Sequence, residues 1–153
     1  MLIAHRGNLH GRQPDDENTP AYVDAAIGRG FHVEVDLWVM RGIAFLGHDA
    51  PAYQVNLDWL QDRQASLWLH CKNTAALSFV VDTNLNWFFH ENDPYTLTSH
   101  GHIWCFPGKP IPAGPSVALW FEAGNPLEND QHKDLFALCG DNVADWIIDA
   151  NPD

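Results

Sequence analysis

The clearest pattern in the sequence is a strict alternation of apolar and polar side chains between His32 and Val39. A period of two predicts a β-strand, because successive side chains of a strand point to opposite faces. Glu34 and Asp36 therefore project from the same face. Carboxylates this close repel each other, and one pKa rises unless a cation lies between them. A hard divalent metal ion is one such cation, and a solvated strand face is the alternative.

The same strand is predicted to return as a β-hairpin. Residues 43–46 form a second apolar segment, and Gly42 precedes it. Glycine readily takes the left-handed conformation that hairpin loops need. We expect a three-residue loop at 40–42, and a two-residue loop is the alternative.

The length of this loop decides where His48 lies. With a three-residue loop, His48 is opposite Glu34, and opposite residues of an antiparallel pair share a face. With a two-residue loop, His48 is opposite Val35, on the wrong face, unless Gly47 forms a bulge. The three-residue loop therefore predicts that the hairpin delivers His48 to the two carboxylates.

Strands and helices are expected to alternate along the rest of the chain. Further strands are predicted at residues 2–4, 67–72, 87–89, 103–106, 117–121 and 146–148, and helices at 20–28, 57–64, 74–81 and 130–138, with a brief helical turn near 95–99. Thr19 before Pro20 is a typical helix start. Strands that alternate with crossover segments indicate an α/β domain with a parallel sheet.

Polar residues recur where the predicted strands end, which is where (β/α) barrels place their active sites. A complete eight-stranded barrel usually needs about 200 residues or more, and this chain has 153. We therefore expect residues 1–153 to form one compact, shortened TIM-type (β/α) barrel, with about seven strands plus the hairpin after the second strand. Trp68, Trp104 and Trp120 are expected to fill its interior.

Composition narrows the class of partner. The net charge of −12 argues against nucleic acid or an anionic membrane surface, and it is compatible with cation binding. No apolar run approaches the length of a transmembrane helix, and the first residues lack the pattern of a signal peptide, so we expect no membrane insertion and a cytoplasmic location. The three cysteines have no paired spacing, which fits reduced thiols.

Four motifs occur in a recognisable order. They are Ile3-Ala4-His5-Arg6-Gly7, Glu17-Asn18-Thr19, Val33-Glu34-Val35-Asp36 and Gly47-His48-Asp49, with a further segment at 144–152. Together they resemble the N-terminal signature and the last strand of the glycerophosphodiester phosphodiesterase family. That family belongs to the phospholipase-C-like phosphodiesterases, which are TIM barrels. The middle of this chain is shorter than is usual in the family.

The resemblance implies a hydrolase that cleaves a small phosphodiester, of the glycerophosphodiester type, with the help of one divalent metal ion. His5 and His48 would be its general acid/base pair. Arg6 would hold the phosphate, and Glu34 and Asp36 would bind the metal.

One position departs from the family pattern. The family's third metal ligand is a Glu two residues before a Lys, and here Lys72 matches but His70 replaces the Glu. The ion, Mg, Ca, Mn or Zn, is therefore open, although imidazole suits Zn, Mn, Fe or Co better than Ca. Lys72 would join the phosphate contacts. His90 and Glu122 are possible additional site residues, and Glu17 is expected to act as a buttress.

Two other functions fit the same residues. One is a non-catalytic module, derived from this family, that binds a phosphorylated sugar or a lipid fragment and whose metal site is altered by His70. The other is an enzyme that cleaves a different phosphodiester, such as a glycan-linked glycerophosphate. The presence of both His5 and His48 favours an enzyme, because binding alone needs no acid/base pair.

Overall fold

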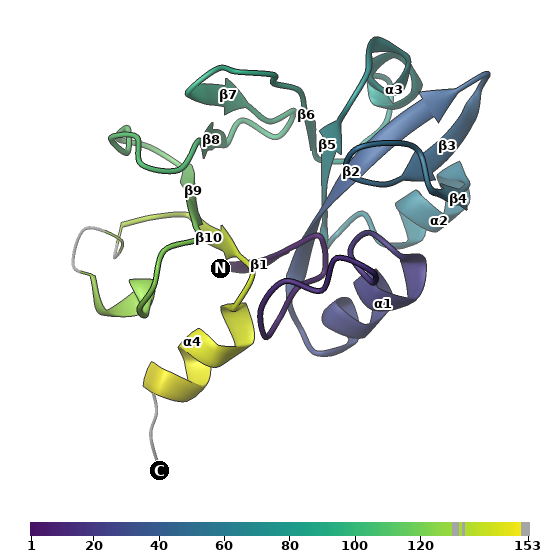
Figure 1. Cartoon of the computed structure of the whole chain (residues 1–153). Helices are drawn as coiled ribbons and strands as arrows, with labels where there is room; N and C mark the ends of the chain where they lie inside the picture. The colour runs from purple at the N-terminus through teal and green to yellow at the C-terminus, as the bar shows by residue number, and fades with distance from the viewer. Residues whose placement is uncertain (130–131, 133, 151–153) are drawn as a thin grey trace.

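The computed structural model describes residues 1–129, 132 and 134–150. Its strands belong to one sheet that curls into a partial barrel, as Figure 1 shows. The strands are β1 (Leu2–His5), β2 (His32–Met40), β3 (Ile43–Leu46), β4 (Tyr53–Val55), β5 (Leu67–Cys71), β6 (Trp87–Phe88), β7 (Tyr95–Leu97), β8 (Ile103–Cys105), β9 (Ser116–Trp120) and β10 (Ala137–Gly140). The helices are α1 (Pro20–Gly28), α2 (Leu57–Asp62), α3 (Thr74–Val80), the 3-10 helix η1 (Pro126–Glu128) and α4 (Val143–Ala150).

Strand β2 is the centre of the sheet because it has three neighbours. One edge pairs in parallel with β5. The other edge pairs first with β1, up to Glu34, and then with the antiparallel β3, from Leu37 onward. Strands β10, β9 and β8 continue the parallel sheet beyond β1. The carboxyl ends of these parallel strands meet at one end of the barrel, as the sequence predicted for an α/β domain.

Hydrogen bonds join the two edges of the curled sheet. Strand β6 forms one edge, and β7, which pairs with β8, forms the other. The backbone N–H of Ser99 donates to the Trp87 carbonyl at 2.7 Å, and Thr96 Oγ1 donates to the Phe89 carbonyl at 2.9 Å. These bonds satisfy polar groups that an open sheet edge would expose.

The alternation of side chains divides the core into two layers. On β2 the apolar positions face outward, where α1 and α3 pack, and Glu34 and Asp36 face inward. Large side chains fill the inside of the curl, namely Ile3, Trp68, Phe88, Trp104 and Val117. Trp68 and Trp104 are therefore interior residues, as predicted. Trp120 is not, because it packs, partly buried, against the outer layer.

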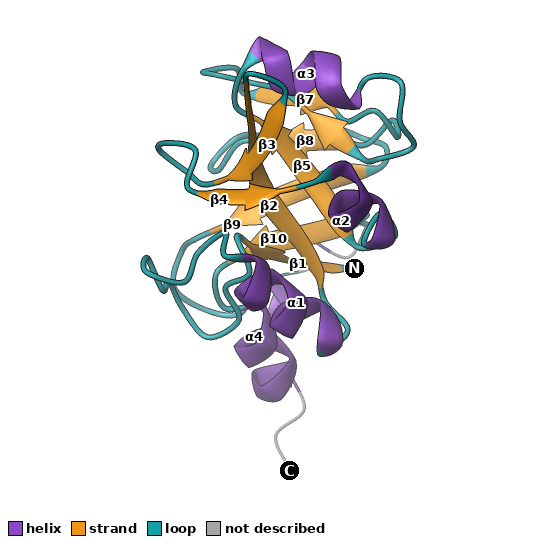
Figure 2. Ribbon diagram, turned by 90° about the vertical axis from the view of Figure 1, so that its right-hand side faces the viewer, coloured by secondary structure: helices purple, strands orange, loops and turns teal. Residues whose placement is uncertain are grey.

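Short connections explain how the curl forms from so few residues. Helices α1, α2 and α3 lie outside one half of the sheet, whereas loops join the strands β6 to β10 on the other half (Figures 1 and 2). Strand β7 occupies part of the connection between β6 and β8, and a Pro/Gly-rich loop at 107–115 connects β8 to β9. Loops need far fewer residues than crossover helices.

Three element predictions are wrong. A helix was predicted at 130–138, but its last two residues belong to the strand β10. Residues 130, 131 and 133 of this prediction lie outside the described residues. The residues of β10 are all buried, and a continuous apolar run of this kind does not distinguish a buried parallel strand from a helix. The strand predicted at 146–148 belongs to α4, which buries Trp146 and exposes Ile148. The turn predicted near 95–99 is β7, and β4 was not predicted.

The hairpin loop also differs from the prediction. Met40 pairs with Ile43, so the loop has two residues, Arg41 and Gly42. Their φ angles are 53° and 79°, and positive φ at both positions defines a type I′ turn. The sequence signal was weak because Arg, unlike Asn or Asp, rarely takes the first of these positions.

Two general expectations concern the whole chain. Cys71, Cys105 and Cys139 are buried and unpaired, as expected for reduced thiols. The helices of the described residues are all too short or too polar to span a lipid bilayer.

The close packing of β10 against α4 gives a test of this fold. A Cβ on Gly140 would lie 2.5 Å from the Trp120 carbonyl oxygen and 2.5 Å from the Trp146 ring, whereas a Cβ on Gly28 would meet nothing within 4 Å. We expect Gly140→Ala to lower the free energy of unfolding by about 1–3 kcal/mol through overpacking. The control Gly28→Ala should be neutral or stabilising by up to about 1 kcal/mol, because alanine favours the helix. Urea unfolding of both variants measures the difference, and equal stabilities would contradict the packing.

Candidate metal and phosphate site

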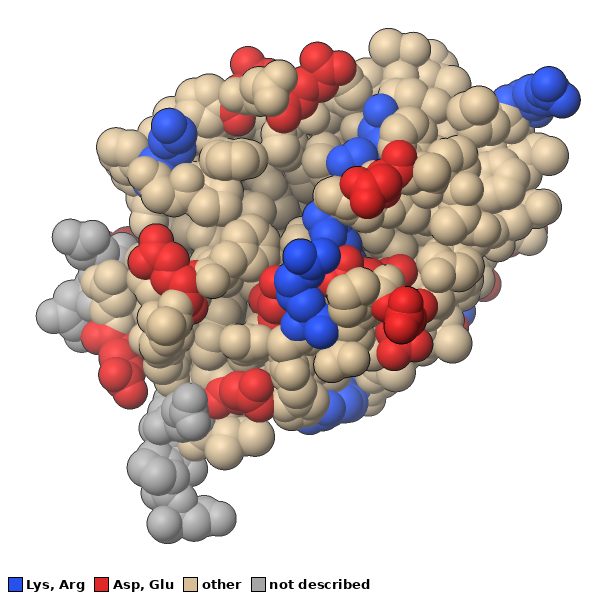
Figure 3. All heavy atoms as spheres, viewed as in Figure 1, with Lys and Arg blue, Asp and Glu red and all other residues tan. Residues whose placement is uncertain are grey.

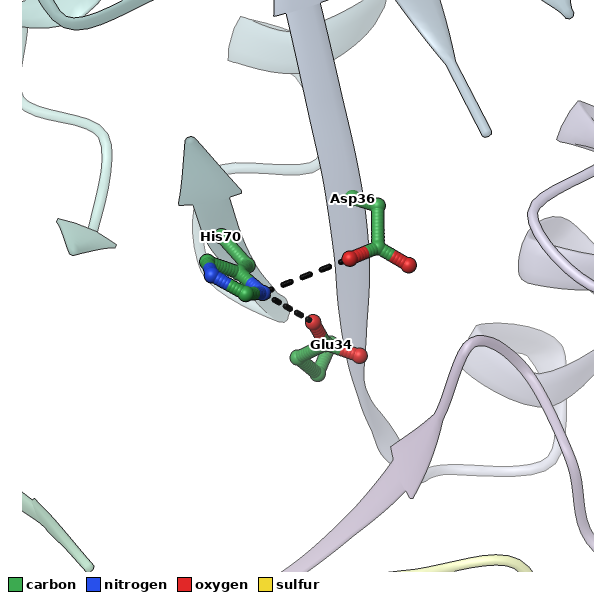
Figure 4. Close-up of side chains that lie close together, drawn as sticks. All are labelled: Glu34, Asp36 and His70. Carbon is green, nitrogen blue, oxygen red and sulfur yellow. Dashed lines mark ion pairs between the residues drawn. The ribbon is translucent and has the colours of Figure 1, made fainter. Parts of the chain in front are cut away.

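Glu34, Asp36 and His70 form the one group of at least three metal-ligating side chains found among the described residues. Glu34 and Asp36 project inward from β2, and His70 projects from β5, where it is paired with Asp36. His70 Nδ1 lies 3.3 Å from Asp36 Oδ1 and 3.8 Å from Glu34 Oε1. Figure 4 shows the three side chains converging. The group could hold a metal ion.

Both oxygens of the Asp36 carboxylate have polar partners. Oδ1 lies 3.3 Å from His70 Nδ1 and 3.3 Å from Lys72 Nζ. Oδ2 accepts a hydrogen bond from Asn18 Nδ2 at 3.0 Å and lies 3.1 Å from Arg6 Nε. Burial alone would raise the pKa of Asp36, but the hydrogen bond from His70 and the charges of Lys72 and Arg6 outweigh it and lower the pKa. Asp36 is therefore ionised.

Glu34 lies in the opposite electrostatic situation. It is 2% exposed, and its Oε2 accepts no hydrogen bond from the described residues. Its ion-pair candidates are both histidines: His70 Nδ1 lies 3.8 Å from Oε1, and His5 Nε2 lies 3.9 Å from Oε2. Burial, and then the charge of Asp36, raise the pKa of Glu34. A bound cation would reverse this effect and release a proton, so the unpaired oxygen fits a metal ligand.

The orientation of His70 also fits a cation. Its Nε2 lies 3.3 Å from the His90 carbonyl oxygen, and a carbonyl only accepts, so Nε2 carries a hydrogen. With a hydrogen on Nε2, Nδ1 donates the hydrogen bond to Asp36 only when the ring is protonated, and in the neutral ring it presents its lone pair to Asp36 and Glu34. A lone pair facing two carboxylates is repulsive unless the ring is protonated or a cation lies between them. The His90 ring stacks on His70 with centroids 4.5 Å apart and fixes its plane.

His5 is held by a carboxylate that the sequence analysis missed. Its Nδ1 lies 2.9 Å from Asp141 Oδ1, which also accepts a hydrogen bond from Asn8 Nδ2 at 2.9 Å. An ionised carboxylate only accepts, so Nδ1 of His5 carries the hydrogen and Nε2 is free to accept a proton. Nε2 is also the atom that faces Glu34.

Asp141 is a polar residue at the end of a strand, which is the same pattern that pointed to His5 in the sequence. It follows the last residue of β10, just as Arg6 follows β1, and the two strands are parallel neighbours. The prediction of a helix at 130–138 concealed this strand end. A search for polar residues behind every apolar run, whichever element it was assigned to, would have found Asp141.

His48 reaches the site although the hairpin has a two-residue loop. The ladder with β2 ends at Leu46, and Gly47 takes a φ of 150°. A Cβ on Gly47 would collide with the Ala50 carbonyl, so the sharp turn requires glycine. His48 then lines the same cavity as Glu34. The expected outcome therefore holds, but the turn at Gly47 produces it instead of the strand register.

The electrostatics of His48 favour its neutral form. Its Nδ1 lies 2.7 Å from Asp49 Oδ1, which leaves Nε2 free by the reasoning used for His5. Burial, and then the positive charge of Arg6, lower the pKa of His48. Its side chain is 41% exposed, so protons exchange with solvent.

A cavity of about 480 Å³ brings these groups together. It is lined at its polar end by His5, Arg6, Glu34, Asp36, His48, His70, Lys72 and His90. In Figure 3, basic and acidic atoms crowd together beside a hollow in the face of the molecule. Arg6 and Lys72 are the basic residues, as expected for phosphate contacts, but each already pairs with a carboxylate. A phosphate anion would therefore need an additional cation at this site.

The three additional candidate residues, Glu17, His90 and Glu122, lie in different places. Glu17 pairs with Arg6 at 3.1 Å and with Arg12 at 3.2 Å, which is the buttress role expected for it. His90 lines the cavity, and burial, followed by the charges of His70 and Lys72, lowers its pKa to about 4. Glu122 lines an adjoining cavity of about 570 Å³, which also includes His5 and His48.

The Glu17 buttress predicts a pH dependence of stability. Burial would raise the pKa of Glu17, but hydrogen bonds from Arg12, Asn8 and Arg6 lower it from 4.5 to about 2. A lowered pKa stabilises the folded state above pH 4.5, and this contribution is lost as the pH falls toward about 2. The shift corresponds to about 3 kcal/mol.

We therefore expect Glu17→Gln to be less stable than the wild type by about 3 kcal/mol at neutral pH. The difference should shrink as the pH is lowered from 4.5 toward about 2. Urea unfolding across this range gives the two stability curves. Asp58→Gln, on the exposed face of α2, controls for the loss of one carboxylate. A Glu17→Gln difference that stays constant with pH would contradict the buttress.

The ligand group predicts which variants lose metal binding. Wild-type protein should bind Mn²⁺ or Zn²⁺ with one ion per chain, and Asp36→Asn and His70→Ala should each weaken binding by at least about tenfold. His32→Ala is the matched control, because His32 lies on the same face of β2 at its other end. Isothermal titration calorimetry gives stoichiometry and affinity. Undiminished affinity in both variants would rule out this site.

Comparison with known proteins leaves the family open. No protein-family model, no curated protein and no solved structure matches the chain. The resemblance of the four sequence motifs thus remains an expectation. The function is inferred from the side chains and their geometry.

Proposed function

We propose that this protein is a metal-dependent phosphodiesterase that hydrolyses a glycerophosphodiester-type substrate on a shortened TIM-type barrel. The observation that carries the proposal is that His5 and His48 line one cavity with the Glu34, Asp36 and His70 group. Two imidazoles that each turn Nδ1 toward a carboxylate and leave Nε2 for proton transfer, beside a group that could hold a cation, are the components of general acid/base cleavage of an anionic ester.

The charges of the site support a phosphodiester as the substrate. Arg6 and Lys72 supply two positive charges, but Asp36 and Glu17 pair with them. A divalent cation held by Glu34, Asp36 and His70 would neutralise the anionic oxygens of the phosphate and lower the pKa of a bound hydroxyl. Arg6 and Lys72 would then orient the phosphate and stabilise the charge that develops on it.

The two histidines differ in their surroundings, which suggests separate roles. His5 takes the proton from the attacking hydroxyl, because Asp141 stabilises the imidazolium that forms. The attacking oxygen forms a bond to phosphorus as the bond to the leaving alkoxide breaks. His48, whose side chain is 41% exposed, first takes up a proton from solvent on Nε2 and then donates it to that alkoxide, which returns His48 to its neutral form. The attacking hydroxyl belongs to water or to a neighbouring hydroxyl of the substrate.

Removal of either imidazole should separate turnover from metal binding. We expect His5→Ala and His48→Ala to lower kcat by about 10²–10⁴-fold on a phosphodiester such as glycerophosphocholine or bis(p-nitrophenyl) phosphate. Metal affinity should change little, because neither histidine belongs to the proposed ligand group. Spectrophotometric assays and calorimetry provide the two readouts.

His100→Ala is the matched control, because His100 is an exposed histidine that lines a different pocket from the proposed site. Full activity in His5→Ala would refute the acid/base assignment. Absence of turnover by the metal-loaded wild type, together with binding of phosphate esters, would instead favour the binding-module function.

A further inference from the structure

A second and larger cavity adjoins the proposed catalytic one. It has a volume of about 800 Å³, within the range of small-molecule binding sites. The two cavities share Phe106, Pro107, Leu119 and Phe121 in their walls. One end of the larger cavity therefore lies directly beside the polar groups of the site.

The walls of this cavity are mainly apolar. They come from the loop at 107–115, from β9 and, after η1, from Asn129, His132, Asp134 and Leu135. In Figure 1 this loop lies beside β8 and β9, on the side of the barrel away from α1, α2 and α3. Ile111 and Leu135 contribute aliphatic surface, and the proline rings of the loop add to it. The charged side chains that line the cavity are Lys109, Glu122 and Asp134.

Two aromatic rings mark the passage between the cavities. Phe106 follows β8 and is 46% exposed, and Phe121 follows β9 and is 44% exposed. The Phe121 ring lies 4.8 Å from the His5 ring, centroid to centroid. Exposed aromatic surface that faces a cavity is stabilised when an apolar ligand covers it. A phosphate beside His5 would thus have one ester arm directed past Phe121.

We infer that this second cavity binds an unbranched alkyl or acyl chain, so that the substrate is a phosphodiester that carries a single apolar chain. This inference rests on the proposed function and names the substrate class of the same site. A sugar is a poorer fit, because its hydroxyls would lose their hydrogen bonds against Ile, Leu, Pro and Phe side chains.

Binding of alkyl phosphates tests the inference without requiring turnover. Isothermal titration calorimetry would compare glycerol 3-phosphate, butyl phosphate and octyl phosphate, each below the concentration at which it forms micelles. Each buried methylene should tighten binding by about three- to fourfold, so octyl phosphate should bind roughly a hundredfold more tightly than butyl phosphate. Ile111→Asn should lower the ratio of the octyl phosphate affinity to the butyl phosphate affinity at least about tenfold, because it places an amide in the apolar wall.

Ile43→Asn is the matched control, because Ile43 is 44% exposed at the start of β3 and lines neither cavity. A wild-type protein that binds butyl and octyl phosphate equally, or that prefers glycerol 3-phosphate to both, overturns the inference even if Ile111→Asn fails to fold.

Hydrolysis of methyl and octyl p-nitrophenyl phosphate separates the two proposals. Preference for the octyl ester supports both. Equal turnover of the two esters supports the phosphodiesterase and overturns the apolar chain. Chain-length-dependent binding without hydrolysis of either ester overturns the phosphodiesterase alone.

Discussion

The Asp36 carboxylate is 1% exposed, and a buried charge destabilises a protein unless opposite charges and hydrogen bonds surround it. The chain provides these partners from three separate regions: Arg6 after β1, Asn18 before α1, and His70 with Lys72 at the end of β5. Asn18 also accepts a hydrogen bond from the Asp36 backbone N–H, at the point where β1 ends and β3 takes over its edge of β2. Arg6 and Asn18 adopt positive φ angles of 55° and 63°, and such an angle costs roughly 1–2 kcal/mol for Arg and less for Asn. The backbone strain therefore lies at residues whose side chains contact the Asp36 carboxylate, and the proposed site is built around the same carboxylate.

The curled sheet is covered unequally, and this difference shapes both cavities. Helices α1 to α3 cover the outer face of the half of the sheet that contains β2 and β5, the strands that carry Glu34, Asp36 and His70. Loops on the other half save residues but leave Phe106 and Phe121 partly exposed at the strand ends. The half covered by helices therefore carries the charged groups of β2 and β5, while the half joined by loops forms most of the apolar wall of the larger cavity. Binding sites commonly combine a rigid scaffold with loops of this kind.

The sequence predicted well what depends on local periodicity and poorly what depends on tertiary packing. The inward projection of Glu34, Asp36 and His70 followed from alternation, which has the same meaning in every strand. Strand β10 and helix α4 were misassigned, because their apolar runs fit either structure until their neighbours are known. That error hid Asp141, whose partner His5 is distant in sequence. His48 was assigned to the site through a hairpin register that is wrong, and only the conformation of Gly47 in the folded chain shows how it arrives there. The larger cavity, whose walls come in large part from the loop at 107–115, left no pattern that a reading of single strands and helices could detect.

The pairing of β1 with β10 also orders the events of folding. His5 and Asp141 are 136 positions apart, whereas the acidic pair of β2 is separated from His70 only by the segment that forms β3, β4 and α2. Contacts between distant positions form slowly, because a long loop must close first. During synthesis on the ribosome, Glu34, Asp36 and His70 have all emerged once β5 is complete, and domains begin to fold from their N-terminal side. A nascent chain that has emerged only as far as β9 would therefore contain these three side chains but not Asp141, and His5 would gain its Asp141 partner only when β10 pairs with β1.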